Sequence, residues 1–289
     1  MSEPEPQRQL RQDAQQQSPA PAHPVASSDP VAAALRVEGL SRHFGSLKAV
    51  DDVSFEVRPG SRHAVIGPNG AGKSTLFALV AGALRATSGK VWLHGEDVTS
   101  LAEHARARRG LVRTFQHSSL FLTASARENV LLALQRKHGI QGRPWGAITR
   151  RRALVAEADA VLEQFFLHHR AAQVAGALSH GERRQLEVAV ALATSPSVLL
   201  LDEPAAGMSP ADTQAFQEIV LGLPAEVTVL LVEHDLDLVF GVADQVTVMQ
   251  LGRHLLTGDP AQVRSSDAVQ QAYLGDEDTS DLFLQDGHV

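Results

Sequence analysis

The chain has 289 residues, 44% of them hydrophobic, which is enough to bury a sizeable core in one or two domains. No run of 18 apolar residues occurs, so no transmembrane helix is predicted, and the absence of cysteine excludes disulfides, thiol catalysis and cysteine metal sites. The net charge of −7 is polarised, since residues 276–289 hold five acids and no Lys or Arg, and nothing in the sequence resembles a general nucleic-acid patch.

The first 30 residues are rich in Gln, Pro, Ala and Ser and contain almost no large apolar side chains. Such a segment buries too little apolar surface to offset the entropy of ordering, so residues 1–30 are predicted to be a disordered leader. It opens with acids and prolines, where a secretory signal would carry basic residues and an apolar core. The ordered domain is expected over residues 34–275, and the acidic tail 276–289 is expected to be disordered.

Four strand-like runs open the domain: Leu35–Glu38, Val53–Val57, His63–Ile66 and Val91–His94. The third run leads into an octet that fits G-x-x-x-x-G-K-[ST], a phosphate-binding loop, followed by helical composition from Thr75 to Gly82. In such a turn, backbone N–H groups and the helix N-terminus point at one anionic group. Lys73 would reach the β- and γ-phosphates of a nucleotide, and the Ser74 hydroxyl would bind Mg²⁺. The residues assigned to this site are Gly67, Pro68, Asn69, Gly70, Ala71, Gly72, Lys73, Ser74 and Thr75.

The middle of the chain has apolar residues at helical spacing, which predicts helices over Arg127–Gln135, Arg151–Phe166 and Glu182–Ala193. Strands return at Val198–Leu201 and Val227–Val232, whose continuous apolar runs are typical of a parallel sheet buried on both faces. Helices are predicted after Pro210 and after Asp235, before a last strand pair at Gln245–Gln250 and His254–Thr257. This order predicts an α/β fold, a phosphate-loop NTPase core with an inserted α-helical subdomain at about residues 117–193.

Two acids end the buried run Val198–Leu201. A carboxylate at the carboxyl edge of a parallel sheet lies beside the phosphate loop, where Mg²⁺ needs anionic surroundings, and Asp202 fits that role. Glu203 points elsewhere and is predicted to polarise the attacking water. The alternative is a strand that ends in two solvated acids.

Between these elements, Leu178-Ser179-His180-Gly181-Glu182 resembles the L-S-G-G-Q signature of the ATP-binding-cassette (ABC) ATPases. The resemblance covers about residues 34–275, with five elements in the family's order: the phosphate loop, Gln116, the signature, Asp202-Glu203 and His234. It implies an antiparallel β subdomain beside the core and ATP with Mg²⁺ as cofactors. The sequence departs from the pattern at His180 and Glu182. By itself, Ser179 is only a candidate N-cap of the helix that follows.

The resemblance also implies roles for single residues. Gln116 matches the glutamine that touches Mg²⁺ or the lytic water, and His234 matches the histidine that hydrogen-bonds the γ-phosphate. Phe44 matches the aromatic residue that stacks on adenine, with simple packing as the alternative. Ser179, Gly181 and Glu182 would bind the nucleotide held by a second ATPase subunit, identical or not, so that two chains enclose two nucleotides.

Within the family, three further segments are similar to the ATPase subunits of branched-chain amino-acid importers: Val112–Gln116, Asp202–Met208 and Ala272–Gly275. Urea or short-chain amide importers and lipopolysaccharide-export ATPases are alternatives, as is a soluble ABC protein outside transport. The importer resemblance implies two permease subunits as partners, an indirect extracytoplasmic solute-binding protein, no nucleic acid, and a peripheral location on the cytoplasmic face of the bacterial inner membrane.

The permeases are expected to dock in a cleft formed mostly by residues 116–134, with Phe121 and Leu122 as exposed apolar contacts. The acid-free stretch Arg136–Arg152 is predicted to be a loop beside this cleft. Two interpretations of this loop stand: it contacts a permease or anionic lipid headgroups, or it is simply a solvated basic loop.

Overall fold

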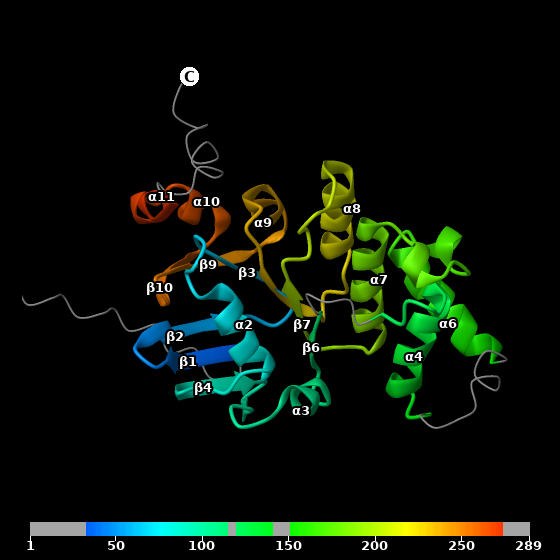
Figure 1. Ribbon diagram of the computed structural model, residues 1–289, viewed down its shortest axis with the longest axis horizontal. Helices are drawn as coiled ribbons and strands as arrows, with labels where there is room; N and C mark the ends of the chain where they lie inside the picture. The colour runs from blue at the N-terminus through cyan, green and yellow to red at the C-terminus, as the bar shows by residue number, and fades with distance from the viewer. Residues whose placement is uncertain (1–32, 115–119, 141–150, 274–289) are drawn as a thin grey trace, which may run out of the picture.

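The computed structural model describes residues 33–114, 120–140 and 151–273. The predicted leader, the acidic tail and Gln116 lie outside these residues. Within them, no helix is long and apolar enough to cross a membrane. Figure 1 shows a body of two sheets and their covering helices, with a group of helices at one side.

A six-stranded sheet forms the centre of the molecule, in the order β10-β9-β3-β8-β7-β6. Its strands are β3 (Arg62–Ile66), β6 (Leu111–Arg113), β7 (Val198–Asp202), β8 (Thr228–Val232), β9 (Gln245–Gln250) and β10 (Arg253–Gly258). Neighbouring strands are parallel except for the β9–β10 hairpin. The predicted parallel sheet is therefore confirmed.

The central strands divide their side chains between two cores. Leu200 of β7 and Val232 of β8 pack with Leu76 and Phe77 of helix α2 (Lys73–Ala81). The intervening residues, such as Leu201, pack with the helices on the opposite face of the sheet. Because strand side chains alternate between faces, a run that is apolar throughout serves both layers. These strands are buried along their whole length.

A second, antiparallel sheet covers α2 from the other side, in the order β2-β1-β4-β5. Its strands are β1 (Leu35–Phe44), β2 (Leu47–Val57), β4 (Ser88–Leu93) and β5 (Glu96–Asp97). This sheet is the antiparallel subdomain that the ABC resemblance implies.

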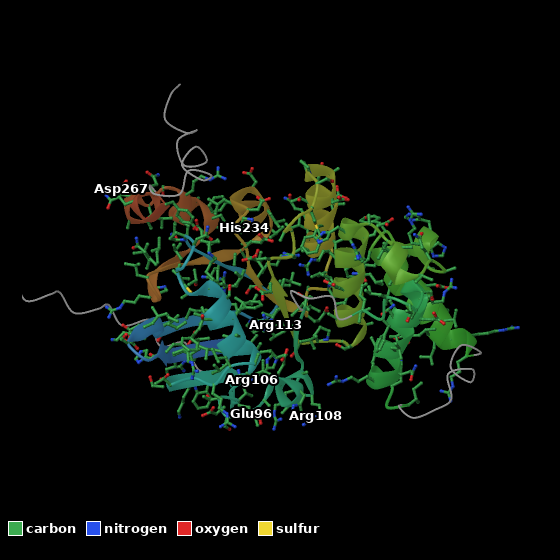
Figure 2. The ribbon with its side chains drawn as sticks, viewed as in Figure 1. Glu96, Arg106, Arg108, Arg113, His234 and Asp267 are labelled. Carbon is green, nitrogen blue, oxygen red and sulfur yellow. The ribbon has the colours of Figure 1, made fainter. Side chains whose placement is uncertain are left out.

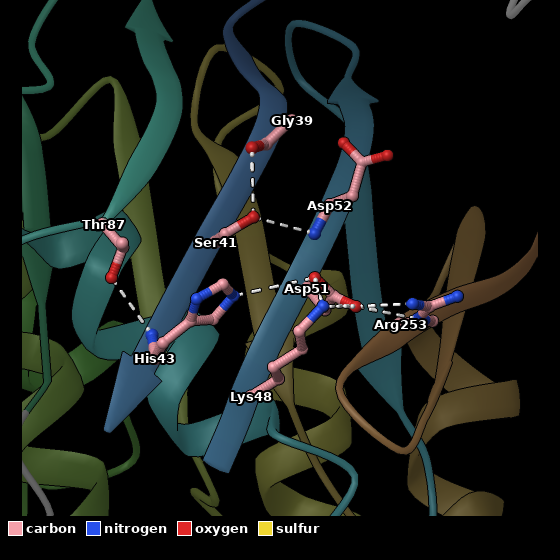
Figure 3. Close-up of polar contacts among 8 residues, drawn as sticks. All are labelled: Gly39, Ser41, His43, Lys48, Asp51, Asp52, Thr87 and Arg253. Carbon is pink, nitrogen blue, oxygen red and sulfur yellow. Dashed lines mark hydrogen bonds and ion pairs between the residues drawn. The ribbon is translucent and has the colours of Figure 1, made fainter. Parts of the chain in front are cut away.

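Asp51 joins this sheet to the β9–β10 turn (Figure 3). Its carboxylate accepts hydrogen bonds from Arg253 Nη2 at 2.6 Å and Arg253 Nε at 3.0 Å, and it forms an ion pair with Lys48. The Arg253 hydrogen bonds are the main reason that the pKa of Asp51 lies below its usual value. The Asp51 N–H also donates to the Gly252 carbonyl at 2.8 Å, so backbone and side chain hold the same junction.

The helical group contains α4 (Ala126–Lys137), α6 (Arg152–Gln164) and α7 (His180–Ala193), with short turns at His168–Arg170 and Ala175–Ala177. The apolar faces of the three helices meet in one core that continues onto the central sheet. The described residues also form α8 (Pro210–Leu221), α9 (Leu236–Val242), α10 (Pro260–Arg264) and α11 (Asp267–Tyr273).

Sequence reasoning missed helix α3 (Glu103–Ala107), which is only five residues long. Arg106 of this helix is buried and donates to the Leu79 and Val80 carbonyls at 2.8 and 2.6 Å. The last carbonyls of a helix carry partial negative charge, so this arginine satisfies the end of α2. Burial lowers the pKa of Arg106 to about 10, and the group stays charged at neutral pH.

Candidate functional site

Three chemistry-bearing loops meet at one edge of the central sheet. The phosphate loop follows β3, Glu203 follows β7, and Glu233 and His234 follow β8. These strands are parallel neighbours in the order β3-β8-β7, so their carboxyl ends lie at the same edge. Ligands of open α/β sheets bind outside such an edge.

The phosphate loop uses glycine where the chain has no room for a side chain. Gly72 has φ +97°, and a Cβ there would lie 2.2 Å from the Ala49 carbonyl oxygen. The Ala71 carbonyl accepts from the Gly252 N–H at 3.0 Å, which braces the loop against the β9–β10 turn. The loop therefore holds a conformation that other residues would strain.

Lys73 and Ser74 open α2 behind this loop. Lys73 is buried, and its ammonium donates to the Gly67 carbonyl at 2.5 Å and the Pro68 carbonyl at 3.2 Å. The Ser74 side chain is exposed. Helix α2 has Gly72 as its N-cap, with no side-chain hydrogen bond to its first turn and no acid there. Its N-terminal N–H groups and positive dipole end form an anion site.

Asp202 ends β7 and is 1% exposed. Its Oδ2 accepts from Arg113 Nη2 at 2.5 Å, while Oδ1 is buried and has no hydrogen-bond partner in the described parts of the chain. Arg113 ends β6 and lies beside α2, with its guanidinium 5.7 Å from the Phe77 ring centroid. Figure 2 labels Arg113 near the centre of the molecule. One oxygen of Asp202 is thus fixed by a cation and the other is left for a ligand.

Glu203 and His234 complete this edge. Glu203 has φ +44°, an uncommon conformation for a residue with a side chain, and its N–H donates to the Val232 carbonyl at 2.9 Å. The His234 side chain is 62% exposed, as expected for a group that meets a ligand. Glu233, directly before His234 in the chain, is fully buried, and burial raises the pKa of its carboxyl group.

The signature residues lie elsewhere, at the start of α7. Ser179 is the N-cap, and its Oγ accepts from the Glu182 N–H at 3.1 Å while Glu182 Oε2 accepts from the Ser179 N–H at 2.8 Å. Glu182 Oε1 also accepts from Arg170 Nε at 2.7 Å. Helix α7 begins at His180 rather than at Glu182 as predicted, so Gly181 lies in its first turn. The described contacts of Ser179 and Glu182 are local, and do not reach the sheet edge.

Phe44 ends β1 and is 46% exposed. The Arg42 guanidinium lies 4.5 Å from the centroid of its ring, a cation–π contact. The ring therefore has exposed surface available for stacking.

Sequence reasoning missed Arg113 and Glu233. Glu233 adjoins His234, and Arg113 is three residues before Gln116, but the partners of both are distant in sequence: Arg113 binds Asp202, and Glu233 accepts from the Ala205 N–H at 2.7 Å. A charged residue beside a buried strand was the available signal, because such a charge needs a partner. Gln116, the remaining predicted site residue, lies outside the described residues.

Comparison with known proteins gives the family. The ABC transporter model matches residues 50–206, more than half of the chain, and the branched-chain amino acid ATP-binding cassette transporter model matches residues 253–279. BraF of Pseudomonas aeruginosa, a high-affinity branched-chain amino acid transport ATP-binding protein, is 40% identical over 251 residues, covering 84% of this chain and 98% of BraF. LivG of Escherichia coli K12, described in the same words, is 39% identical over 249 residues, covering 84% and 98%.

Other relatives show how far the likeness extends. LptB of Haemophilus influenzae, a lipopolysaccharide export ATP-binding protein, is 34% identical over 244 residues, covering 84% of this chain and 98% of LptB. The crystal structure of the ADP conformation of MJ1267, an ATP-binding cassette of an ABC transporter, superimposes with a TM-score of 0.74 at 32% identity, covering 84% of this chain and 99% of that one. The chain therefore belongs to the ABC transporter family, as one of its ATP-binding, ATP-hydrolysing proteins.

Proposed function

We propose that this protein powers the uptake of branched-chain or other hydrophobic amino acids through partner permeases. The observation that carries this assignment is the match of residues 253–279 to the branched-chain transporter model, at the end of a chain 40% identical to BraF. The lipopolysaccharide-export protein LptB is less similar, at 34% identity.

The residues at the sheet edge fit Mg²⁺ and the phosphates of ATP. Asp202 offers a buried oxygen without a hydrogen-bond partner in the described residues, and Ser74 offers an exposed hydroxyl; both are hard oxygen ligands of the kind Mg²⁺ prefers. Gln116 is the third proposed ligand. When bound, Mg²⁺ would neutralise phosphate charge. Lys73 and the backbone N–H groups of the loop 67–75, which Pro68 lacks, would hold the β- and γ-phosphates.

Glu203 is proposed as the general base that takes a proton from the attacking water, and His234 as a donor to the γ-phosphate. The strained backbone at Glu203 fits such a role, because strain is tolerated where a side chain must be aimed. Phe44 would stack on adenine. Ser179, Gly181 and Glu182 would meet the nucleotide held by a second ATPase subunit, in a homodimer or a heterodimer.

The permease surface is proposed at a cavity of about 1080 Å³ between the end of α2, helix α3 and the ends of α4 and α7. Its charged lining is mostly basic: Glu103, His104, Arg108, Arg113, Arg136 and Lys137. Phe121 and Leu122 are exposed as expected, but they do not line this cavity. That residues 116–134 form most of the docking cleft stays a prediction; residues 116–119 lie outside the described residues, and α4 lines this cavity with Arg136 and Lys137 at its end.

The predicted loop Arg136–Arg152 is also corrected at its ends, since Arg136 and Lys137 belong to α4 and Arg152 begins α6. Its central residues, 141–150, lie outside the described part. Two permeases, an extracytoplasmic solute-binding protein that acts through them and a peripheral position on the cytoplasmic face of the bacterial inner membrane complete the proposal. No nucleic-acid partner is proposed.

The test is purification of the tagged chain from its own membranes, followed by transport assays in proteoliposomes. We expect two permeases to co-purify, and ATP-driven uptake of radiolabelled leucine in the presence of the binding protein. The matched control is the Glu203→Gln protein, which should assemble and fail to transport. Uptake of urea without leucine, association with lipopolysaccharide-export proteins, or a chain without membrane partners would each contradict the assignment.

A further inference from the structure

Glu233 is a buried acid to which the ATP hydrolysis proposed above assigns no role. It is 0% exposed and directly follows β8. A buried carboxylate costs free energy unless donors surround it. In the described parts of the chain, its hydrogen-bond donors are backbone N–H groups, and the His234 ring lies beside it.

The two oxygens of Glu233 serve different loops. Oε1 accepts from the Ala205 N–H at 2.7 Å, in the loop after β7. Oε2 accepts from the His234 N–H at 3.0 Å and, more weakly, from the Asp235 N–H at 3.4 Å, in the loop after β8. The carboxylate therefore bridges two loops that are about thirty residues apart in the chain.

The loop after β7 is the one that carries Glu203. The Glu203 N–H donates to the Val232 carbonyl at 2.9 Å, and its own carbonyl accepts from the Ala206 N–H at 3.2 Å. With the Ala205 hydrogen bond to Glu233, this short turn is tied to the end of β8 on both sides of Pro204. The uncommon φ of +44° at Glu203 is held by these two ties.

The loop after β8 is the one that carries His234. The Nδ1 atom of His234 lies 3.6 Å from Glu233 Oε2, which is too long for a hydrogen bond. At this distance the carboxylate still faces the Nδ1 edge of the ring. The side chain is otherwise largely exposed, and Figure 2 labels it at the sheet edge. Glu233 thus contacts the backbone of the loop after β7, and both the backbone and the His234 ring in the loop after β8.

We propose that Glu233 is a positioning residue for ATP hydrolysis, whose single carboxylate holds Glu203 and His234 in a fixed relation across the ends of β7 and β8. This inference rests on the roles proposed above for those two residues. Glu233 itself does not touch nucleotide. Its loss should slow the chemical step and leave nucleotide binding intact, because the phosphate loop follows a different strand, β3.

The test variant is Glu233→Gln, which keeps the shape of the side chain but replaces one acceptor oxygen by an NH₂ donor. That donor must face one of the backbone N–H groups, so one of the two loops is released. We expect kcat for ATP hydrolysis by the full chain to fall about 10- to 100-fold, the effect of one unsatisfied buried donor, with KM and the ATP dissociation constant unchanged. Hydrogen exchange should rise at the amides of Glu203, Ala205 and Ala206, even without nucleotide.

The matched control is Asp235→Asn, the same acid-to-amide change two residues away. Asp235 caps α9 by accepting from the Leu238 N–H at 3.0 Å, and asparagine caps helices equally well. We expect wild-type kcat and unchanged exchange at residues 203–206 in this protein. A similar loss of kcat in both variants would overturn the proposal in favour of a general charge effect.

Two further outcomes would also overturn it. One is a Glu233→Gln protein with wild-type kcat, and the other is a protein in which kcat, ATP affinity and melting temperature fall together, as for a purely structural residue. In a Glu203→Gln background, adding Glu233→Gln should cause no further loss, since the group that it positions is already absent. Wild-type hydrolysis by Glu203→Gln alone would refute the assigned base rather than the bridge, which the exchange measurement tests separately.

Discussion

Helices α2 and α7 both begin with residues assigned to phosphate, yet their first turns are built differently. Helix α2 has glycine at its N-cap, no side-chain cap and no acid in its first turn. Helix α7 has a reciprocal capping box between Ser179 and Glu182, and Arg170 binds the same glutamate. The first turn of α2 is thus open to an anion, whereas that of α7 already has its own partners.

This difference separates two kinds of phosphate site. The α2 end, with Lys73 and the loops after β7 and β8, brings together the residues proposed to hold the phosphates and to supply the general base. The α7 end brings a hydroxyl and a helix dipole but also a carboxylate, which disfavours a free anion. It is better suited to complete a site in which another subunit already holds the nucleotide.

The largest expected effect separates chemistry from binding at the α2 end. Replacing Glu203 by glutamine should lower kcat by about 10²- to 10⁴-fold, because a general base is lost, and leave the ATP dissociation constant unchanged. ATPase assays and equilibrium binding on the same preparation measure both. The variant should accumulate as an ATP-bound dimer, visible by size-exclusion chromatography. Turnover near the wild-type rate would show that Glu203 is not the base.

The next effect is on binding. Lys73→Ala should weaken ATP binding about 10- to 100-fold, through loss of a charge-assisted hydrogen bond to phosphate. Lys90→Ala is the control, since this lysine is exposed and pairs with Asp97 on the antiparallel sheet. Calorimetric titration with ATP compares the two. If both variants bind ATP with equal affinity, Lys73 does not hold phosphate and the α2 end is not the proposed nucleotide site.

The α7 end is tested by dimer formation. Ser179→Arg should leave ATP binding to the monomer unchanged and block the ATP-induced dimer, because a long cation would occupy the contact with the second subunit. Ser125→Arg is the matched control, since Ser125 caps α4 in the same reciprocal way with Glu128. Both variants should lose about 1 kcal/mol of stability with the cap. An ATP-induced dimer in both would leave Ser179 as an N-cap alone.

The smallest effect concerns Glu182 and pH. Burial alone would raise the pKa of this carboxyl, but hydrogen bonds from the Ser179 N–H and from Arg170 outweigh it, and the net pKa lies below the usual value. A depressed pKa stabilises the fold above the unfolded-state pKa, and this stability is lost as the pH falls through the folded-state value.

We therefore expect wild type to be more stable than Glu182→Gln at pH 7 by about 1 kcal/mol, with the gap closing below about pH 4.5. Urea unfolding at a series of pH values measures this difference in stability. Glu128→Gln, in the capping box of α4, is the comparison variant. A gap that does not depend on pH would mean that charge is irrelevant to the α7 cap.

Much of the fold was predictable because its signals are local. The buried strands β7 and β8 were identified from continuous apolar runs, and the phosphate loop from the spacing of its glycines and lysine. Helix α3 and strand β6 were missed because five and three residues are too short to show a period. The start of α7 was placed two residues late because the capping box, rather than the apolar pattern, decides where that helix begins.

The sequence by itself therefore placed the proposed site residues at or directly after the carboxyl ends of β3, β7 and β8, and their order indicated the family and its chemistry. Tertiary structure decided which of those ends meet: the order β3-β8-β7 brings the three loops to one edge. It alone paired Asp202 with Arg113 and Glu233 with Ala205. Local propensity acts over a few residues, whereas these partners are 89 and 28 residues apart and meet only when the sheet assembles.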